Sequence, residues 1–327
     1  MTLPGADGAA AAAVRVEGLT RSFGRGSKSV PVLDGVSLQV RKGEVVALLG
    51  VNGAGKTTLI KILSTLLLPT SGSAVVAGCD VVREPRRARK ATSVVFGGDR
   101  GLYSRLTGRD NLRFFGMLAG LGRRELRVRI DSALEQVNLV SSADKRVETY
   151  SRGMRQRLHL AVGILASPQV LLLDEPTMGL DPVESDRLRD VILTMRDSGV
   201  AVLLTSHYLL DVDKLATRVL LLSGGRIREN LTLAEFVRAS GHAATVTIRG
   251  RGTPPDVAAG RLPATVVASC VQQDSGTWVA DLRLREWSGD VFGLLDDLLV
   301  GAKVEDVQVR ETRLEEAFTA ISARLTS

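Results

Sequence analysis

The chain has 327 residues, of which 44% are hydrophobic, 24% are charged and 4% are aromatic. This length suits one large domain and a smaller second one. Lysine and arginine outnumber aspartate and glutamate by 43 to 36, and the basic side chains are densest at 83–90 and 123–129. Such stretches are typical of solvated helix faces or of a surface that faces anionic lipid headgroups. Because no aromatic residues are interleaved with them, they argue against a nucleic-acid partner.

The sequence predicts neither a membrane-spanning segment nor a disulfide bond. Its apolar runs are shorter than the roughly 18 residues that a spanning helix requires. The first residues lack the basic start and the apolar stretch of a signal peptide. Cys79 and Cys270 show no metal-ligand spacing and suit free thiols in a reducing compartment. We therefore expect a cytoplasmic chain that reaches a membrane only through a partner.

Residues 1–13 are rich in glycine and alanine and predict a disordered tail. From 14 to 40, valine and leucine alternate with polar residues, which predicts antiparallel strands with one face in water. The run 45–49 is apolar throughout, the pattern of a buried parallel strand. A helix from Thr57 to about Leu67 should follow and end before Pro69.

Between 106 and 139 the periodicity becomes helical and predicts a helical insert, within a subdomain of about 100–168. The two apolar faces are Leu112, Phe115, Leu118 and Ala119, and Leu126, Ile130, Leu134 and Val137. The elements expected after them are a helix at 151–166, a strand at 170–173, a helix from Pro182 to Gly199 with Asp181 as N-cap and Glu184 completing a capping box, and strands at 200–205 and 219–222. Strands that alternate with helices indicate an α/β fold with a mostly parallel, covered sheet.

After Gly225 the pattern changes to that of a small α+β domain, which we place at 243–327. A short helix at 232–240 carries a capping box of Thr232 and Glu235. The elements expected beyond it are strands at 245–248, 265–271, 278–284 and 304–309, a hairpin turn at Asp274, Ser275 and Gly276, a helix at 288–300, and a last helix with Leu314, Phe318, Ile321 and Leu325 on one face.

The most specific motif is the glycine-rich loop that follows the run 45–49. It reads Gly50, Val51, Asn52, Gly53, Ala54, Gly55, Lys56, Thr57 and Thr58 and fits the pattern G-x4-G-K-[ST]. A strand should precede this loop and a helix should follow it, so backbone N–H groups at the helix N-terminus can bind phosphate oxygens. The motif predicts an ATP site in which Lys56 contacts the β- and γ-phosphates and the Thr57 hydroxyl ligates Mg²⁺.

A second motif places two acidic residues at the end of the strand expected at 170–173. Asp174 would ligate Mg²⁺, and Glu175 would polarise an attacking water as a general base. Two acids at a strand end carry little information by themselves. The glycine-rich loop upstream makes the nucleotide site the better interpretation.

Between these motifs, residues 150–157 read YSRGMRQR, and here the chain resembles the ABC transporter ATPases, whose signature reads LSGGQ. It departs from that signature at Tyr150, Arg152 and Met154. The resemblance, over roughly 14–230, implies that Ser151 and Gly153 contact a γ-phosphate, whereas the alternative is an ordinary serine-capped helix. It also implies a P-loop cassette over 14–242 with an antiparallel β subdomain and a helical subdomain, followed by the accessory domain.

Three further residues match this family. Asp181 resembles the aspartate that bridges to the other subunit, a role compatible with an N-cap. His207 resembles the switch histidine that senses the γ-phosphate, although a lone histidine is more often structural. Phe23 resembles the aromatic residue that stacks on adenine, with packing in the core as the alternative.

One position departs from the family where a glutamine should follow the segment 92–96. The chain has no glutamine at 97–100, and Gly98 stands at that position. In the family this glutamine touches Mg²⁺ or the attacking water, so we hypothesise that Asp99 or a bound water replaces its contact. A regulatory, non-hydrolysing nucleotide binder is the alternative that this departure raises, and the intact catalytic motifs weigh against it.

The resemblance also implies partners. Two cassettes, here two copies of this chain, would pack head to tail around ATP beneath a separate membrane permease, peripheral on the cytoplasmic face. The signature variant, the stretch 95–98 and the segment 312–318 resemble the daunorubicin-resistance branch, which implies export of drug-like or lipophilic substrates. An importer subunit, or a non-transport ATPase acting on ribosomes or DNA, stays open. The single cassette without a heptad run favours transport.

Overall fold

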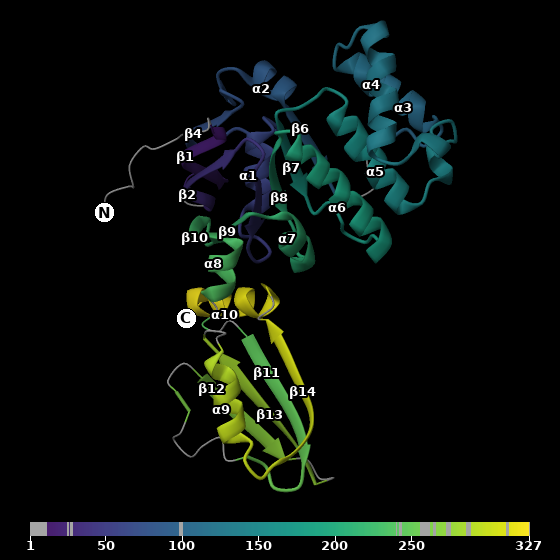
Figure 1. Ribbon diagram of the computed structural model, residues 1–327. Coiled ribbons are helices and arrows are strands. Elements are labelled where there is room, and N and C mark those ends of the chain that lie inside the picture. Colours follow the sequence, from purple (N-terminus) through teal and green to yellow (C-terminus); the bar gives the residue numbers. More distant parts are fainter. Residues whose placement is uncertain are drawn as a thin grey trace. The chain divides into compact units, whose positions relative to one another are not determined.

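The computed structural model describes residues 12–24, 26, 29–97, 101–239, 241, 244–255, 262–263, 266–272, 276–285, 289–311 and 314–326. The chain divides into two compact units, the first ending at Leu231 and the second starting at Thr232 (Figure 1). The sequence had placed this boundary between 242 and 243. The short helix α8 (Leu233–Arg238) contacts α10 (Leu314–Thr326), which explains why it groups with the second unit. Among the described helices, none combines the length and the apolar character needed to cross a membrane.

A six-stranded sheet forms the centre of the first unit. Its order is β10 (Arg226–Thr232), β9 (Arg218–Ser223), β3 (Val45–Leu49), β8 (Ala201–Thr205), β7 (Val170–Asp174) and β6 (Thr92–Phe96). The pairs β3–β9, β3–β8, β8–β7 and β7–β6 are parallel. Every residue of β3 and β8 is buried, because helices cover both faces of such a sheet. The prediction of a mostly parallel, covered sheet is confirmed.

The antiparallel subdomain is a second sheet of the first unit. Its order is β2 (Val30–Arg41), β1 (Ala12–Phe23), β4 (Ser71–Val76) and β5 (Cys79–Asp80). Strand β1 begins at Ala12, so the predicted tail is two residues too long, and its positions 1–11 lie outside the described residues. Local patterns do not predict β4, because half of its six residues are glycine or serine and the apolar alternation is too short to recognise.

The helices of the first unit cover the parallel sheet and build the insert. They are α1 (Lys56–Leu63), α2 (Pro85–Ala91), α3 (Gly108–Leu118), α4 (Arg123–Gln136), the 3-10 turns η2 (Val140–Ser142) and η3 (Val147–Thr149), α5 (Arg152–Ile164), α6 (Pro182–Asp197) and α7 (Leu209–Leu215). Helices α3, α4 and α5 contact one another, as a helical insert requires. The predicted apolar face of α4 is buried, but Leu118 of α3 is 69% exposed. The close packing of α3 is instead at Gly116, where a Cβ atom would collide with Leu126.

Helix α1 ends at Leu63, four residues earlier than predicted. Thr65 adopts a left-handed φ of +62°, the N–H of Leu66 bonds the carbonyl of Lys61, and the N–H of Thr65 bonds that of Ile62. These two bonds form a Schellman motif, which terminates a helix without needing a proline. Because threonine is rare at such a position, the local pattern points to Pro69 as the signal that ends the helix.

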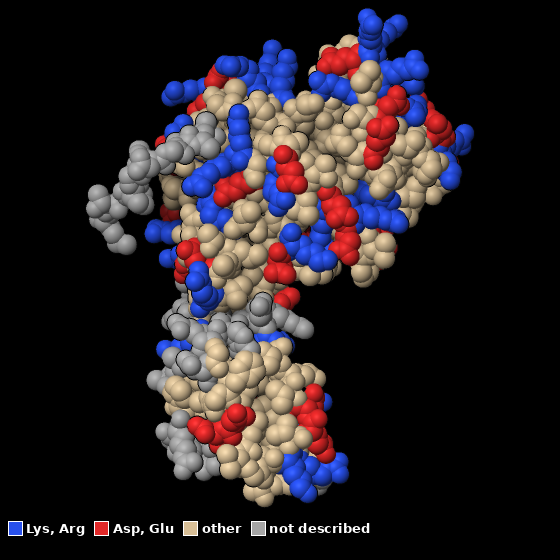
Figure 2. Space-filling model, in the orientation of Figure 1, with Lys and Arg blue, Asp and Glu red and all other residues tan. Residues whose placement is uncertain are grey.

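The two basic stretches lie at the surface of the first unit. Figure 2 shows Lys and Arg side chains gathered over α2 and around the start of α4. Arg87 pairs with Glu84, and Arg129 with Glu125 at 2.8 Å. Both interpretations, a solvated face and a face toward anionic lipid, therefore stay predictions.

The second unit is a four-stranded antiparallel sheet with helices. The order is β12 (Val266–Gln272), β13 (Thr277–Leu284), β11 (Ala244–Arg251) and β14 (Lys303–Glu311). One sheet face packs with Val291 and Leu295 of α9 (Asp290–Leu298) in a core that includes Trp278. The capping box of Thr232 and Glu235 is present, as predicted. The predicted turn residues Asp274 and Ser275, residues 312–313 and the side chain of Leu325 lie outside the described residues.

Candidate active site

The glycine-rich loop connects β3 to α1 and has a conformation that only glycine tolerates at its end. Gly55 has a φ of +108°, and a Cβ atom there would lie 2.7 Å from Leu33 and 2.8 Å from the carbonyl of Val32. Gly55 is also the N-cap of α1, and no side chain caps that helix start. The first amides of α1 are therefore available to an anionic ligand, which the helix dipole favours.

Lys56 is the first residue of α1 and is only 8% exposed. Its ammonium donates hydrogen bonds to the carbonyls of Gly50 at 2.6 Å and Val51 at 3.3 Å, so it lies across the loop. Burial lowers the pKa of Lys56, while the charges of Glu175 and Asp174 act in the opposite direction. A desolvated cation beside free amides is suited to a phosphate group.

Asp174 is the last residue of β7, and its carboxylate accepts hydrogen bonds from two hydroxyl groups. The Thr57 hydroxyl donates to Oδ2 at 2.9 Å, and the Thr205 hydroxyl donates to Oδ1 at 2.6 Å. A hydroxyl and a carboxylate at this distance are hard oxygen donors of the kind that Mg²⁺ takes from proteins that bind it with nucleotide phosphates. Thr205 belongs to none of the sequence motifs. Its role depends on the pairing of Asp174 with Thr205 across β7 and β8, which no local pattern reveals.

Glu175 follows Asp174 in a strained conformation, with a left-handed φ of +55°. Its Oε2 accepts the backbone N–H of His207 at 2.8 Å, and His207 Nε2 lies 3.2 Å from Oε1. Among the described residues no hydrogen bond reaches Oε1, which is buried. Burial raises the pKa of Glu175, partly offset by His207 and Lys56. A carboxylate with one oxygen outside any hydrogen bond and a raised pKa is suited to act as a general base.

An open cavity of about 350 Å³ brings these groups together. Its lining residues are Val32, Asn52, Gly53, Ala54, Gly55, Lys56, Thr57, Thr58, Asp174, Glu175 and His207. The described residues that line it do not include Phe23, Ser151, Gly153 or Asp181. Gly97 lies beside it, since a Cβ atom there would come 2.5 Å from the carbonyl of Glu175. Gly98 and Asp99 lie outside the described residues, so the proposed replacement of the missing glutamine stays a hypothesis.

Phe23 ends β1 with 42% of its surface exposed, so it is not a core residue. The guanidinium of Arg21 lies 4.5 Å from the centre of its ring. A partly exposed ring with a cation on it is compatible with stacking against a base. The stacking role therefore stays a prediction.

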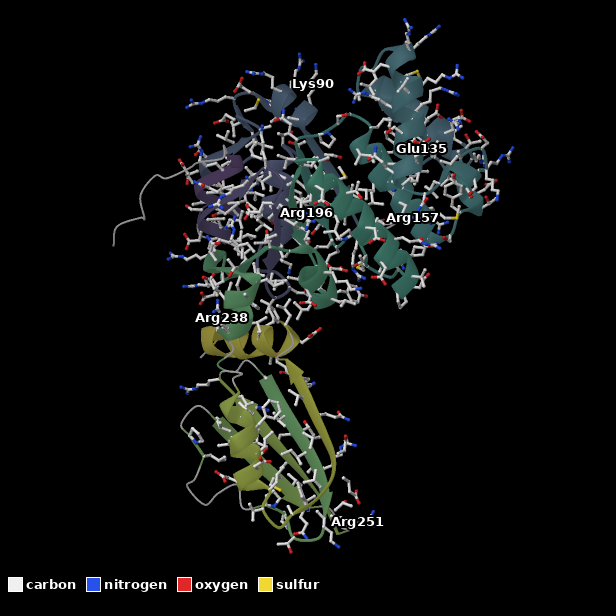
Figure 3. The ribbon with its side chains drawn as sticks, viewed as in Figure 1. Lys90, Glu135, Arg157, Arg196, Arg238 and Arg251 are labelled. Atoms are coloured by element: carbon white, nitrogen blue, oxygen red, sulfur yellow. The ribbon has the colours of Figure 1, made fainter. Side chains whose placement is uncertain are left out.

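The signature segment, residues 150–157, contacts the start of α6 through an ion pair. Ser151 caps α5 by accepting the N–H of Met154 at 3.1 Å, and Asp181 caps α6 through Glu184 N–H at 2.9 Å. The Glu184 carboxylate, expected to complete a capping box, instead pairs with Arg157 at 3.1 Å. Arg157, labelled in Figure 3, lies on α5 and is buried. A Cβ atom at Gly153 would collide with Glu184, so glycine is required here for packing within the chain.

Comparison with known proteins agrees with this geometry. A family model described as ABC transporter matches residues 33–178. The doxorubicin resistance ATP-binding protein DrrA of Mycobacterium tuberculosis is 44% identical over 229 residues, 70% of this chain and 68% of that protein. The daunorubicin resistance ATP-binding protein DrrA3 of Streptomyces coeruleorubidus is 38% identical over 309 residues, 94% of each chain. The chain belongs to the ABC transporter family.

Solved structures agree with this membership. The structure of cbiO1 from Clostridium perfringens, described as part of the ABC transporter complex cbiONQ, has a TM-score of 0.63 and 27% identity. The match covers 68% of this chain and 90% of that one. The present chain is thus an ABC ATPase, an ATP-binding subunit that hydrolyses ATP to drive transport. Its fold is the ABC cassette with an added C-terminal sheet region.

Proposed function

We propose that two copies of this ABC ATPase clamp ATP head to tail and power the export of a drug-like or lipophilic substrate through a separate membrane permease. In this arrangement the chain is peripheral, on the cytoplasmic face. The observation that carries the export proposal is the extent of the likeness to DrrA3. It spans 309 residues and therefore includes the second unit as well as the cassette.

The incomplete cavity supports the clamp. The P-loop, Asp174, Glu175 and His207 line the cavity, while Ser151 and Gly153 are not among the lining residues. Ser151 is exposed at the start of α5, where its hydroxyl and the helix N-terminus are available to a phosphate. Ser151 of a second copy would contact the γ-phosphate and close the site, and Asp181 would lie at the same interface.

The chain's own residues have distinct roles in hydrolysis. The loop amides and Lys56 hold the β- and γ-phosphates, and Phe23 stacks on adenine. Thr57 and Asp174 would hold Mg²⁺, which neutralises charge on the phosphates when it is bound. Glu175 takes a proton from the attacking water through Oε1, which accepts no hydrogen bond from the described residues although His207 Nε2 lies 3.2 Å away. His207 keeps Glu175 oriented through its backbone N–H and senses the γ-phosphate with its ring.

The test begins with a tagged chain, purified from detergent-solubilised native membranes, whose partners are identified by mass spectrometry. A stoichiometric multi-spanning protein is the expected result. Inside-out vesicles that contain both chains should then accumulate daunorubicin only with ATP, and vesicles with Glu175→Gln should not. Recovery of ribosomal or DNA-bound partners alone would refute transport. A multi-spanning partner accompanied by an external binding protein, without daunorubicin uptake, would indicate import instead.

A further inference from the structure

A buried carboxylate lies behind the candidate active site and belongs to none of the motifs. Asp211, in the first turn of α7, has no exposed surface. Its Oδ2 accepts the hydroxyls of Thr177 and of Ser206, the latter at 2.9 Å, and its Oδ1 accepts Arg189 of α6 at 2.7 Å. Thr177, Ser206 and Arg189 are themselves nearly fully buried. The Asp211 side chain thus joins α7 to Thr177 after β7, to Arg189 on α6 and to Ser206 after β8.

The bond to Ser206 fixes the turn that carries His207. Ser206 accepts the N–H of Tyr208 at 3.0 Å while it donates to Asp211, so the hydroxyl closes a turn around His207. The N–H of Asp211 in turn bonds the carbonyl of Tyr208 at 2.9 Å. The backbone N–H of His207 is therefore held where it meets Glu175 Oε2.

The bond from Thr177 to Asp211 fixes the chain on the Glu175 side of the contact between Glu175 and His207. Thr177 lies two residues after Glu175, in a turn where the N–H of Met178 bonds the carbonyl of Glu175 at 3.2 Å. Because Glu175 has a left-handed φ, its conformation persists only if the surroundings hold it. The hydroxyl of Thr177 supplies one such anchor.

We propose that Asp211 is a positioning residue for hydrolysis. Through the hydroxyls of Thr177 and Ser206, it holds the carboxylate of Glu175 and the backbone N–H of His207 within hydrogen-bond distance of each other. Arg189 balances the buried charge, since a lone carboxylate in this place would be strongly destabilising. The inference rests on the proposed role of Glu175 as the base. It adds three residues that do not line the cavity, Asp211, Thr177 and Ser206.

The hydroxyl variants test the proposal more cleanly than a change at Asp211, which would leave Arg189 unpaired and threaten folding. We expect Thr177→Val and Ser206→Ala each to lower the kcat of ATP hydrolysis roughly threefold to tenfold, the equivalent of one lost hydrogen bond. The KM for ATP should change less than twofold. Thr177→Ser, which restores the hydroxyl, should restore kcat.

Two of these readouts separate positioning from a general loss of packing. They are the fall in kcat with a nearly constant KM and the rescue by Thr177→Ser, which a merely structural defect would not show together.

Ser64→Ala is the matched control, because Ser64 is buried, bonds the carbonyl of Lys61 and lies outside the cavity. It should leave kcat and KM unchanged. Unchanged kcat in the double variant Thr177→Val/Ser206→Ala overturns the proposal, as does a loss that Thr177→Ser fails to restore. If Glu175→Gln itself hydrolyses ATP at the wild-type rate, the proposed catalytic base is wrong instead.

Discussion

The two units of this chain use their sheets differently. In the first unit, β7 and β8 are covered on both faces, and their ends bring Asp174 and Thr205 within hydrogen-bond distance. In the second unit, the strands alternate between a buried face and a polar one, on which Thr247 bonds Asp281 at 2.6 Å. The chemistry gathers where parallel strands end at one edge, as it does in other open α/β sheets.

This difference indicates that the candidate active site of the first unit and the hydrophobic core of the second unit can be altered independently. Glu175, whose carboxyl pKa is raised by burial, is at the sheet edge of the first unit, whereas the dominant feature of the second unit is its core, which includes the fully buried Trp278. A change at the edge should therefore alter catalysis without much effect on stability. A change in the second core should do the reverse.

The largest expected effect follows from Glu175→Gln. Removal of a general base costs roughly 10²- to 10⁴-fold in rate, so ATP turnover should fall by at least about 10². ATP binding should persist, and the dimer should be trapped, as size-exclusion chromatography with ATP would show. Wild-type turnover in this variant would contradict the claim that the edge of the parallel sheet carries the catalysis.

The second unit is tested by Trp278→Ala. Truncation of a buried tryptophan costs about 3–5 kcal/mol, which should appear as faster hydrogen exchange in β11 and β13. ATP hydrolysis below the unfolding temperature should change less than twofold. The matched control is Leu172→Ala in β7, also fully buried, which should increase exchange in the parallel sheet instead. Equal loss of hydrolysis in both variants would show that the two cores are not independent.

Local patterns were enough to predict the parallel sheet, and the motifs and the family resemblance pointed to four polar residues that line the cavity, although not to Val32. Lys56, Asp174, Glu175 and His207 each follow or end an apolar strand, so the pattern fixes their place once those strands pair. Short elements such as α7 gave too few periods to recognise.

The buried network was beyond the reach of local patterns. Asp211, Arg189 and Thr177 meet only when α6 and α7 pack against each other, and sequence spacing says nothing of that packing. The same holds for Glu184. Its local pattern predicts a capping box, whereas the tertiary partner Arg157 takes its carboxylate.

Two carboxyl groups, one in each unit, should give opposite pH dependences of stability. Burial raises the pKa of Glu175, so the folded state favours its protonated form, and that contribution is lost as the pH rises through the folded pKa. Glu175→Gln imitates the protonated form. Without nucleotide, this variant should melt at a higher temperature than the wild type at neutral pH, and the two should converge in acid.

Glu235 is the counterpart in the second unit. The backbone N–H and the hydroxyl of Thr232 bond its ionised carboxylate and hold its pKa below the ordinary value. Its contribution is present above the unfolded pKa and is lost as the pH falls through the folded one. Glu235→Gln should therefore melt below the wild type at neutral pH and converge with it in acid. Shifts of the same sign in both variants would contradict the assigned causes.

The smallest effect is expected on the polar face of the second sheet, from Thr247→Val. The lost hydrogen bond to Asp281 is worth about 0.5–1.5 kcal/mol, but valine is well suited to a strand and offsets part of it. Denaturant unfolding should show a net loss below about 1 kcal/mol, with ATP turnover unchanged. The matched change in the first unit is Thr205→Val, which removes a hydroxyl from Asp174 at the same distance of 2.6 Å. If hydrolysis falls with Thr205→Val and not with Thr247→Val, the same bond has a catalytic consequence only at the edge of the parallel sheet.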